Sequence, residues 1–87
     1  MIKATLQISG RHFSAEGKTL VQVFGNLKPT LWRGRGVLQV TRGDIVREKI
    51  LMPAMIARFF GPGSPTSKQI AKKQLLTLFD KKEFERS

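Results

Sequence analysis

The side chains best suited to chemistry in this sequence are cations gathered between residues 28 and 49. They are Lys28, Arg33, Arg35, Arg42, Arg47 and Lys49, and the only tryptophan, Trp32, lies among them. An arginine fork binds phosphate through two parallel hydrogen bonds, and Gly34 and Gly36 would let a nucleic-acid strand approach the backbone. Trp32 would stack on a base if it is exposed, or fill the core of this small domain if it is buried.

A second group of cations, Lys68, Lys72 and Lys73, lies in the segment that we expect to form the last helix. These lysines form either a solvated helix face or a second edge that contacts phosphates. The candidate nucleic-acid-binding residues are therefore Lys28, Trp32, Arg33, Arg35, Arg42, Arg47, Lys49, Lys68, Lys72 and Lys73.

The motifs that suggest nucleotide binding or catalysis are incomplete. Gly17-Lys18-Thr19 ends like a phosphate-binding loop, but His12 occupies the place of that loop's first glycine, and a strand is expected to follow. His12 is the only histidine and Glu16 is the only acid near it, so no partner orients it as an acid or base. We predict no catalytic residue, no metal site and no cofactor, and therefore no enzyme.

Asp44 and Glu48 are the only acids in the middle of the chain, and together they could bind a divalent cation. The cations at positions 42, 47 and 49 surround them, however, and we expect these to pair with the two carboxylates. Asp44 also suits the tight turn expected at residues 42–44. A structural role for both acids is the favoured interpretation.

The apolar pattern predicts the elements that must position the cations. Ile2, Ala4, Leu6 and Ile8 alternate with polar residues, as in a strand with one buried face. We expect a loop at residues 10–18, a second strand at 19–24, an irregular segment at 26–36 and a third strand at 37–41. Residues 45–52 fit either a fourth strand or the start of a helix.

Pro53 favours the strand for that segment, because proline is tolerated at the first position of a helix and not inside one. We therefore expect a strand to about residue 51 and a short helix over 53–60, ended by Gly61 and Pro62. A C-terminal amphipathic helix over 66–82 would begin at Thr66 or Ser67, and residues 83–87 would fray. Its apolar stripe is Ala71, Leu75, Leu78 and Phe79.

Together these elements predict a single α+β domain over residues 1–87. An antiparallel meander of three to four strands fills residues 1–52, and the C-terminal helix packs on the sheet. Much apolar surface is crowded into the short helix and the residue before it, which favours a homodimer if the sheet cannot cover it. The residues concerned are Met52, Met55, Ile56, Phe59 and Phe60.

The charge balance narrows the classes of function. Sixteen lysines and arginines face six acids, a formal net charge of +10 with a pI near 11.1. So large an excess indicates a polyanionic partner, most often nucleic acid. The sequence has no cysteine, no apolar run long enough for a membrane span and no signal-peptide pattern. We expect a cytoplasmic protein with no membrane partner.

Three classes of function remain open. The first is a binding protein for single-stranded or structured DNA or RNA. The second is a small phage or mobile-element regulator whose basic face binds an acidic protein, and the third is a metal-independent ribonuclease that uses His12. In element order, and in the Arg33-Gly34-Arg35-Gly36 run before the third strand, the chain resembles Whirly-type single-strand binders. That resemblance implies a dimer that grips nucleic acid with basic sheet faces.

Overall fold

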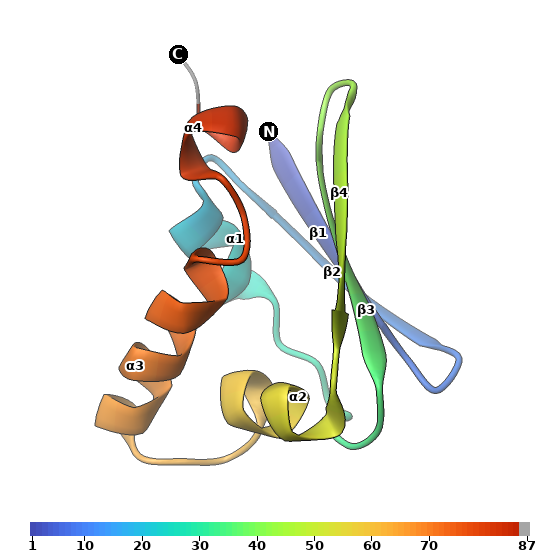
Figure 1. Ribbon diagram of the computed structural model, residues 1–87, viewed down its shortest axis with the longest axis vertical. Coiled ribbons are helices and arrows are strands. Elements are labelled where there is room, and N and C mark those ends of the chain that lie inside the picture. Colours follow the sequence, from blue (N-terminus) through green and yellow to red (C-terminus); the bar gives the residue numbers. More distant parts are fainter. Residues whose placement is uncertain (86–87) are drawn as a thin grey trace.

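The alternating residues at the N-terminus form the centre of an antiparallel sheet in the computed structural model, which describes residues 1–85 (Figure 1). Strand β1 (Ile2–Ile8) buries every second side chain, and β3 (Gly36–Arg42) and β4 (Ile45–Leu51) follow as expected. The tight turn between β3 and β4 has Gly43 at φ 57°, a conformation that glycine adopts without strain. The α+β class and the four-stranded antiparallel sheet are thus confirmed.

The order of the strands differs from the expected meander. The sheet runs β2-β1-β3-β4, so β1 pairs with β2 on one side and with β3 on the other. Leu6 lies opposite Phe13 of β2 and opposite Leu38 of β3. The chain therefore crosses from one edge of the sheet back to its centre between β2 and β3.

The predicted loop at residues 10–18 is wrong, because Arg11–Gly17 forms β2. This strand pairs with β1 along its whole length, from Ile8 opposite Arg11 to Ile2 opposite Gly17. An edge strand gains its backbone hydrogen bonds from one neighbour and can carry polar side chains. Residues 11–17 therefore lack the alternation of apolar and polar residues from which the first strand was predicted.

The predicted strand at residues 19–24 is also wrong, because Leu20–Asn26 forms helix α1. The Thr19 hydroxyl caps this helix by accepting a hydrogen bond from the Gln22 backbone N–H at 3.1 Å. Leu20, Val23 and Phe24 are buried, and their spacing is that of one helix face. Burial against the sheet outweighs the preference of Val23 and its neighbours for strands.

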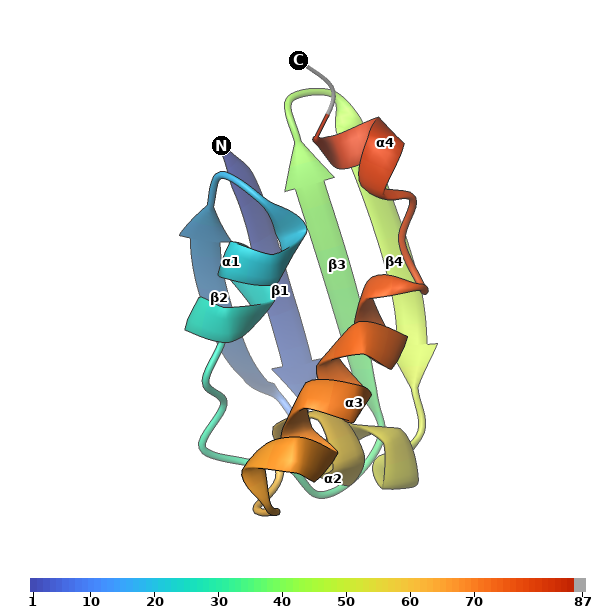
Figure 2. The same ribbon diagram turned by 90° about the vertical axis from the view of Figure 1, so that its left-hand side faces the viewer.

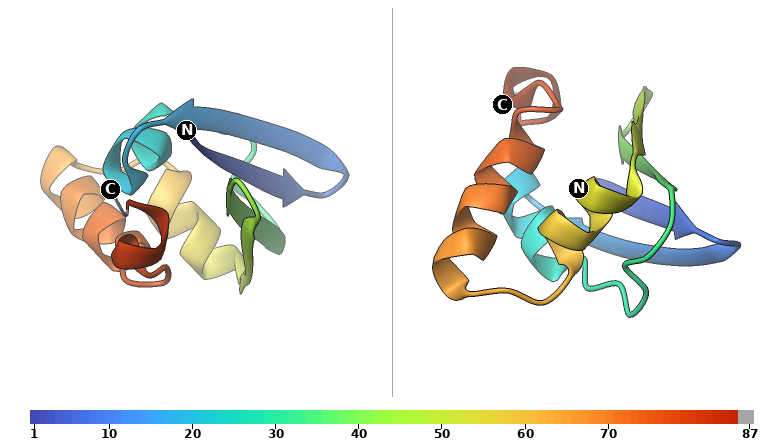
Figure 3. Two further views of the ribbon diagram at one scale, coloured as in Figure 1. Left: turned by 90° about the horizontal axis from the view of Figure 1, so that it is seen from above. Right: turned by 60° about the horizontal axis from the view of Figure 1, so that its bottom comes forward.

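All helices lie on one side of the sheet (Figures 2 and 3). Helix α1 packs over β1 and β2, and α2 (Pro53–Phe60) lies at the end of β4, with Pro53 in its first turn and Gly61 as its C-cap. Helix α3 (Pro65–Leu76) packs against both α1 and α2. The core between these layers includes Leu6, Leu38, Phe24, Ile56 and Leu75, each at most 2% exposed.

The predicted C-terminal helix over 66–82 is two helices. Ser64, and not Thr66 or Ser67, caps α3 by accepting from the Ser67 N–H, with Pro65 in the first turn. After the break, Asp80 caps α4 (Lys81–Phe84). The break lets both Phe79 and Phe84 reach the core, where their rings meet edge to face at 6.2 Å.

The expected fraying of residues 83–87 is wrong for residues 83–85, because Phe84 is fully buried and Glu85 caps α4. Residues 86 and 87 lie outside the described part of the chain. Within residues 1–85, no helix combines the length and apolar character that a membrane crossing requires.

Candidate nucleic-acid interface

The charges of the chain are segregated along the sequence and, through the fold, in space. Residues 17–43 and 49–79 contain no aspartate or glutamate. These runs supply α1, the connecting segment 27–35, α2 and α3, which we call the helical layer. The helical layer carries only cationic charges: Lys28, Arg33, Arg35, Arg58, Lys68, Lys72 and Lys73. These elements therefore present no carboxylate to a polyanion, and the acids on the same side of the sheet, Asp80 and Glu83, belong to the α4 end.

One hollow in the helical layer lies between the end of α1, the end of α2 and the first turns of α3. We call it the Phe60 hollow, and its volume is about 180 Å³. Leu27, Pro29 and Phe59 are buried beneath it, and Phe60 is half-buried. Its lining is Gly25, Leu27, Lys28, Pro29, Phe59, Phe60, Lys68 and Lys72, which combines an apolar floor with three lysines.

A second hollow, of about 420 Å³, lies at the connection between α2 and α3. We call it the Arg58 hollow, and it is lined by Ala57, Arg58, Pro62, Gly63, Ser67, Lys68 and Ile70. Lys68 lines both hollows and therefore joins them into one cationic surface. Two further hollows differ because acids line them: Glu48, Asp80 and Glu83 in the one beside β4, and Glu85 in the one beside the N-terminus.

Lys68 is in an electrostatically unfavourable position. Partial burial, and then the positive charge of Lys72 one helical turn away, lower the pKa of the Lys68 ammonium below its ordinary value. Both causes act against the charged form of the side chain. An anion placed between these two lysines would relieve the second cause, so this spot is a candidate anion site of the helical layer.

Removing the neighbouring charge is expected to reverse part of this shift. In a Lys72→Gln variant, the pKa of Lys68 should rise, because only the desolvation remains. A side-chain NMR titration of the lysine ammonium groups measures this change, with Lys73→Gln as the matched control on the same helix. An unchanged Lys68 pKa in Lys72→Gln would show that the two ammonium groups do not interact.

Trp32, Arg33 and Arg35 lie in the connecting segment 27–35, and both arginines are exposed. Trp32 is 36% exposed, and its ring edge lies against Gly61, since a Cβ on that glycine would stand 3.2 Å from Trp32 Cδ1. Trp32 therefore packs beside the end of α2 and is not part of the buried core. Part of its ring stays accessible, as stacking on a base requires.

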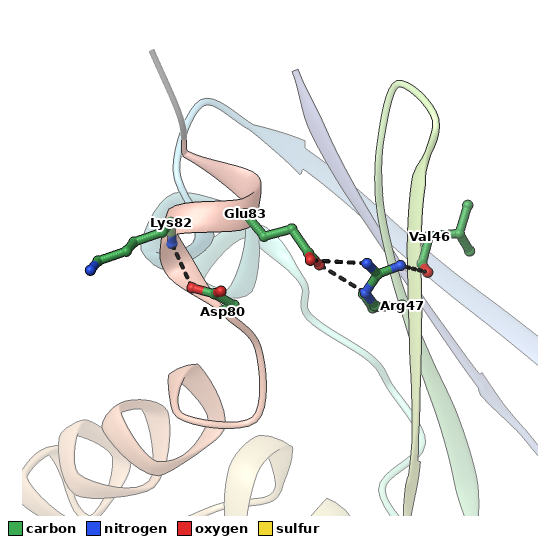
Figure 4. Close-up of polar contacts among 5 residues, drawn as sticks. All are labelled: Val46, Arg47, Asp80, Lys82 and Glu83. Atoms are coloured by element: carbon green, nitrogen blue, oxygen red, sulfur yellow. Dashed lines mark hydrogen bonds and ion pairs between the residues drawn. The ribbon is translucent and has the colours of Figure 1, made fainter.

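Arg42 and Arg47 lie at the other end of the sheet, where both contact α4. Figure 4 shows the pair that Arg47 forms with Glu83. Arg47 binds Glu83 through Nε at 2.8 Å and through Nη2 at 2.9 Å, and Arg42 Nη1 donates to the Phe84 carbonyl at 2.6 Å. The expected pairing of Arg47 with the acids at 44 and 48 is thus replaced by a pair with Glu83. Sequence alone could not place α4 beside these strands.

Lys49 lies on the same strand as Arg47, in a hollow that also contains Glu48, Asp80 and Glu83. Glu48 itself accepts a hydrogen bond from the Gln39 amide at 2.9 Å. The ten candidate residues therefore do not share one surface. Lys28, Lys68 and Lys72 come together at the Phe60 hollow, whereas Arg42, Arg47 and Lys49 lie among acids near α4.

The open face of the sheet is not basic. Its charged side chains are Lys3, Glu16 and Glu48. Lys3 alternates with the buried residues of β1, Glu16 lies opposite Lys3, and Glu48 lies opposite Gln39 on the same face. The basic sheet face implied by the likeness to Whirly-type binders is therefore absent from the described strands. His12 also belongs to this face, opposite Gln7. Among residues 1–85, no three metal-ligating side chains come close enough to hold an ion.

Most of the apolar residues that favoured a homodimer pack against other parts of the same chain. Ile56 and Phe59 belong to the buried core, and Met55 and Phe60 pack against it. Met52 alone of the five is largely exposed, at 47%. Most of the surface that motivated the homodimer is thus covered within the chain, whereas Met52 and part of Phe60 stay accessible.

Comparisons with known proteins give no further identification: no protein-family model, no curated protein and no solved structure matches the chain. Sequence reasoning missed Arg58, Gly25 and Phe60 as parts of a site. Arg58 could have been found from the acid-free run around it. Gly25 and Phe60 could not, because their proximity depends on α1 being a helix.

Proposed function

We propose that this protein binds nucleic acid through the cationic surface that joins the Phe60 hollow and the Arg58 hollow. The observation that carries the proposal is Lys68, which lies between two hollows whose charged lining residues are all cations. Phosphates bound at Lys28, Lys68, Lys72 and Arg58 would release their counterions and relieve the repulsion within the helical layer. Trp32, beside Gly61, is a candidate for an additional stacking contact.

The two alternatives have less support. An acidic protein would satisfy the same charges, but the Phe60 hollow also places an apolar floor beside its lysines, which suits a base next to a phosphate. The ribonuclease alternative needs His12 near the bound phosphates, yet His12 is on the open face of the sheet. The hollows lie among the helices on the opposite face.

Fluorescence anisotropy with labelled oligonucleotides of about 16 nucleotides tests the proposal. Between about 50 and 200 mM salt, four phosphate contacts to a single strand should give a slope of log K against log salt near −3 (about −0.7 for each contact). Quenching of Trp32 in the same titration would support its stacking role. Absence of binding at about 50 mM salt, where non-specific contacts are strong, would contradict the proposal and favour an acidic protein.

A further inference from the structure

We propose that the Phe60 hollow receives one unpaired base, so that the preferred ligand is single-stranded or looped nucleic acid and not a continuous duplex. This inference rests on the proposed function and specifies its ligand. A nucleotide combines a base, which has an apolar ring face, with a charged phosphate nearby. The hollow offers the matching pair of surfaces, with Pro29 and Phe60 in its floor and lysines at its rim.

The size of the hollow fits one ring system. A cavity of about 150 Å³ accommodates a benzene ring, and the Phe60 hollow measures about 180 Å³ and is open to solvent. A base pair within a duplex could not enter without being unpaired and unstacked, which costs free energy. A base of a single strand avoids most of that cost.

Phe60 is the aromatic platform of the hollow. Its ring meets Phe59 edge to face, with centroids 6.3 Å apart and an interplanar angle of 83°. Phe59 is 5% exposed and fixed in the core, so it restrains the orientation of its neighbour. A restrained, half-exposed ring loses little freedom when a base stacks on it.

Gly25 keeps one wall of the hollow open. It lies within α1, where glycine weakens a helix relative to alanine. Nothing in the fold requires glycine there, because a Cβ at this position would meet no atom within 4 Å and its φ is not in the left-handed region. Gly25 lines the hollow, so a larger side chain there has open space in which to extend. Its use for a ligand explains a residue that packing does not.

The first test compares three probes on the unaltered protein: a single strand, the duplex of the same sequence, and a strand of the same length in which abasic sites replace all bases. Stacking contributes about 5- to 150-fold in affinity for each base. The single strand should therefore bind at least about fivefold tighter than the abasic strand, and more tightly than the duplex.

The second test fills the hollow without disturbing the core. Gly25→Gln should weaken single-strand binding by about fivefold or more and leave the salt slope unchanged, because the phosphate contacts remain. Val21→Gln, an exposed position on the same helix, is the matched control and should bind normally. Circular dichroism confirms that both variants are folded.

The outcomes separate this inference from the proposed function. Equal affinity for the normal and abasic strands, with a steep salt dependence, would overturn the base pocket and leave phosphate binding in place. Failure to bind any of the three probes would overturn the proposed function itself. Tighter binding to the duplex than to the single strand would also overturn the base pocket.

Discussion

Replacing Lys28, Lys68 and Lys72 together with glutamine should lower the affinity for single-stranded nucleic acid about a hundredfold at about 0.1 M salt. The three side chains line the Phe60 hollow, and each phosphate contact to a single strand is worth about fivefold at this salt concentration. The slope of log K against log salt should become shallower by about 2. Anisotropy titrations at several salt concentrations measure both quantities.

A variant of equal charge provides the control for that experiment. Changing Lys3, Lys81 and Lys82 to glutamine removes the same number of cations, but Lys3 is on the open face of the sheet and the other two belong to α4. This variant should keep most of its affinity. If both triple variants lose affinity equally, binding depends on net charge alone and the hollows are not the interface.

Replacing Phe84 with alanine should lower the free energy of unfolding by about 3–5 kcal/mol. Phe84 is fully buried although it lies in a four-residue helix near the end of the chain. Its ring contacts Phe79, and its carbonyl accepts the hydrogen bond from Arg42. A small domain has a total stability of about 5–15 kcal/mol, so urea denaturation should show a large shift of the midpoint.

Lys81→Ala is the control for this prediction, because Lys81 is exposed on the same short helix and its loss should change stability by no more than about 0.5 kcal/mol. A loss below about 1 kcal/mol in Phe84→Ala would mean that α4 is largely detached in solution. The exposed ion pair of Arg47 with Glu83 adds little to this anchor, since such pairs contribute about 0–1 kcal/mol.

The elements that could be predicted from the sequence are those with a local physical cause. Alternation identified β1, the proline at 53 placed the start of α2, and Gly61 placed its end. The two elements that follow β1 could not be identified from a local pattern. Arg11–Gly17 has the composition of a loop but gains backbone hydrogen bonds from β1, and Leu20–Asn26 is rich in strand-forming residues but packs as a helix.

The candidate site could be predicted only in part, because its residues come together through tertiary packing. Lys28, Lys68 and Lys72 were identified by their charge, but their convergence requires α1 and α3 to lie side by side. Arg42 and Arg47 were identified by the same criterion, yet they contact Phe84 and Glu83 of α4, away from the Phe60 hollow. Charge predicts only a class of partner to test, whereas the tertiary packing decides which cations would be available to it.

The order of the strands has a consequence for the speed and route of folding. The β1–β2 and β3–β4 hairpins each close through a short turn, but the central β1–β3 pairing joins Ile8 to Gly36 across the intervening strand and helix. Closing that longer loop costs entropy before any of its contacts form. We therefore expect two quickly formed hairpins whose docking, assisted by α1, limits the folding rate.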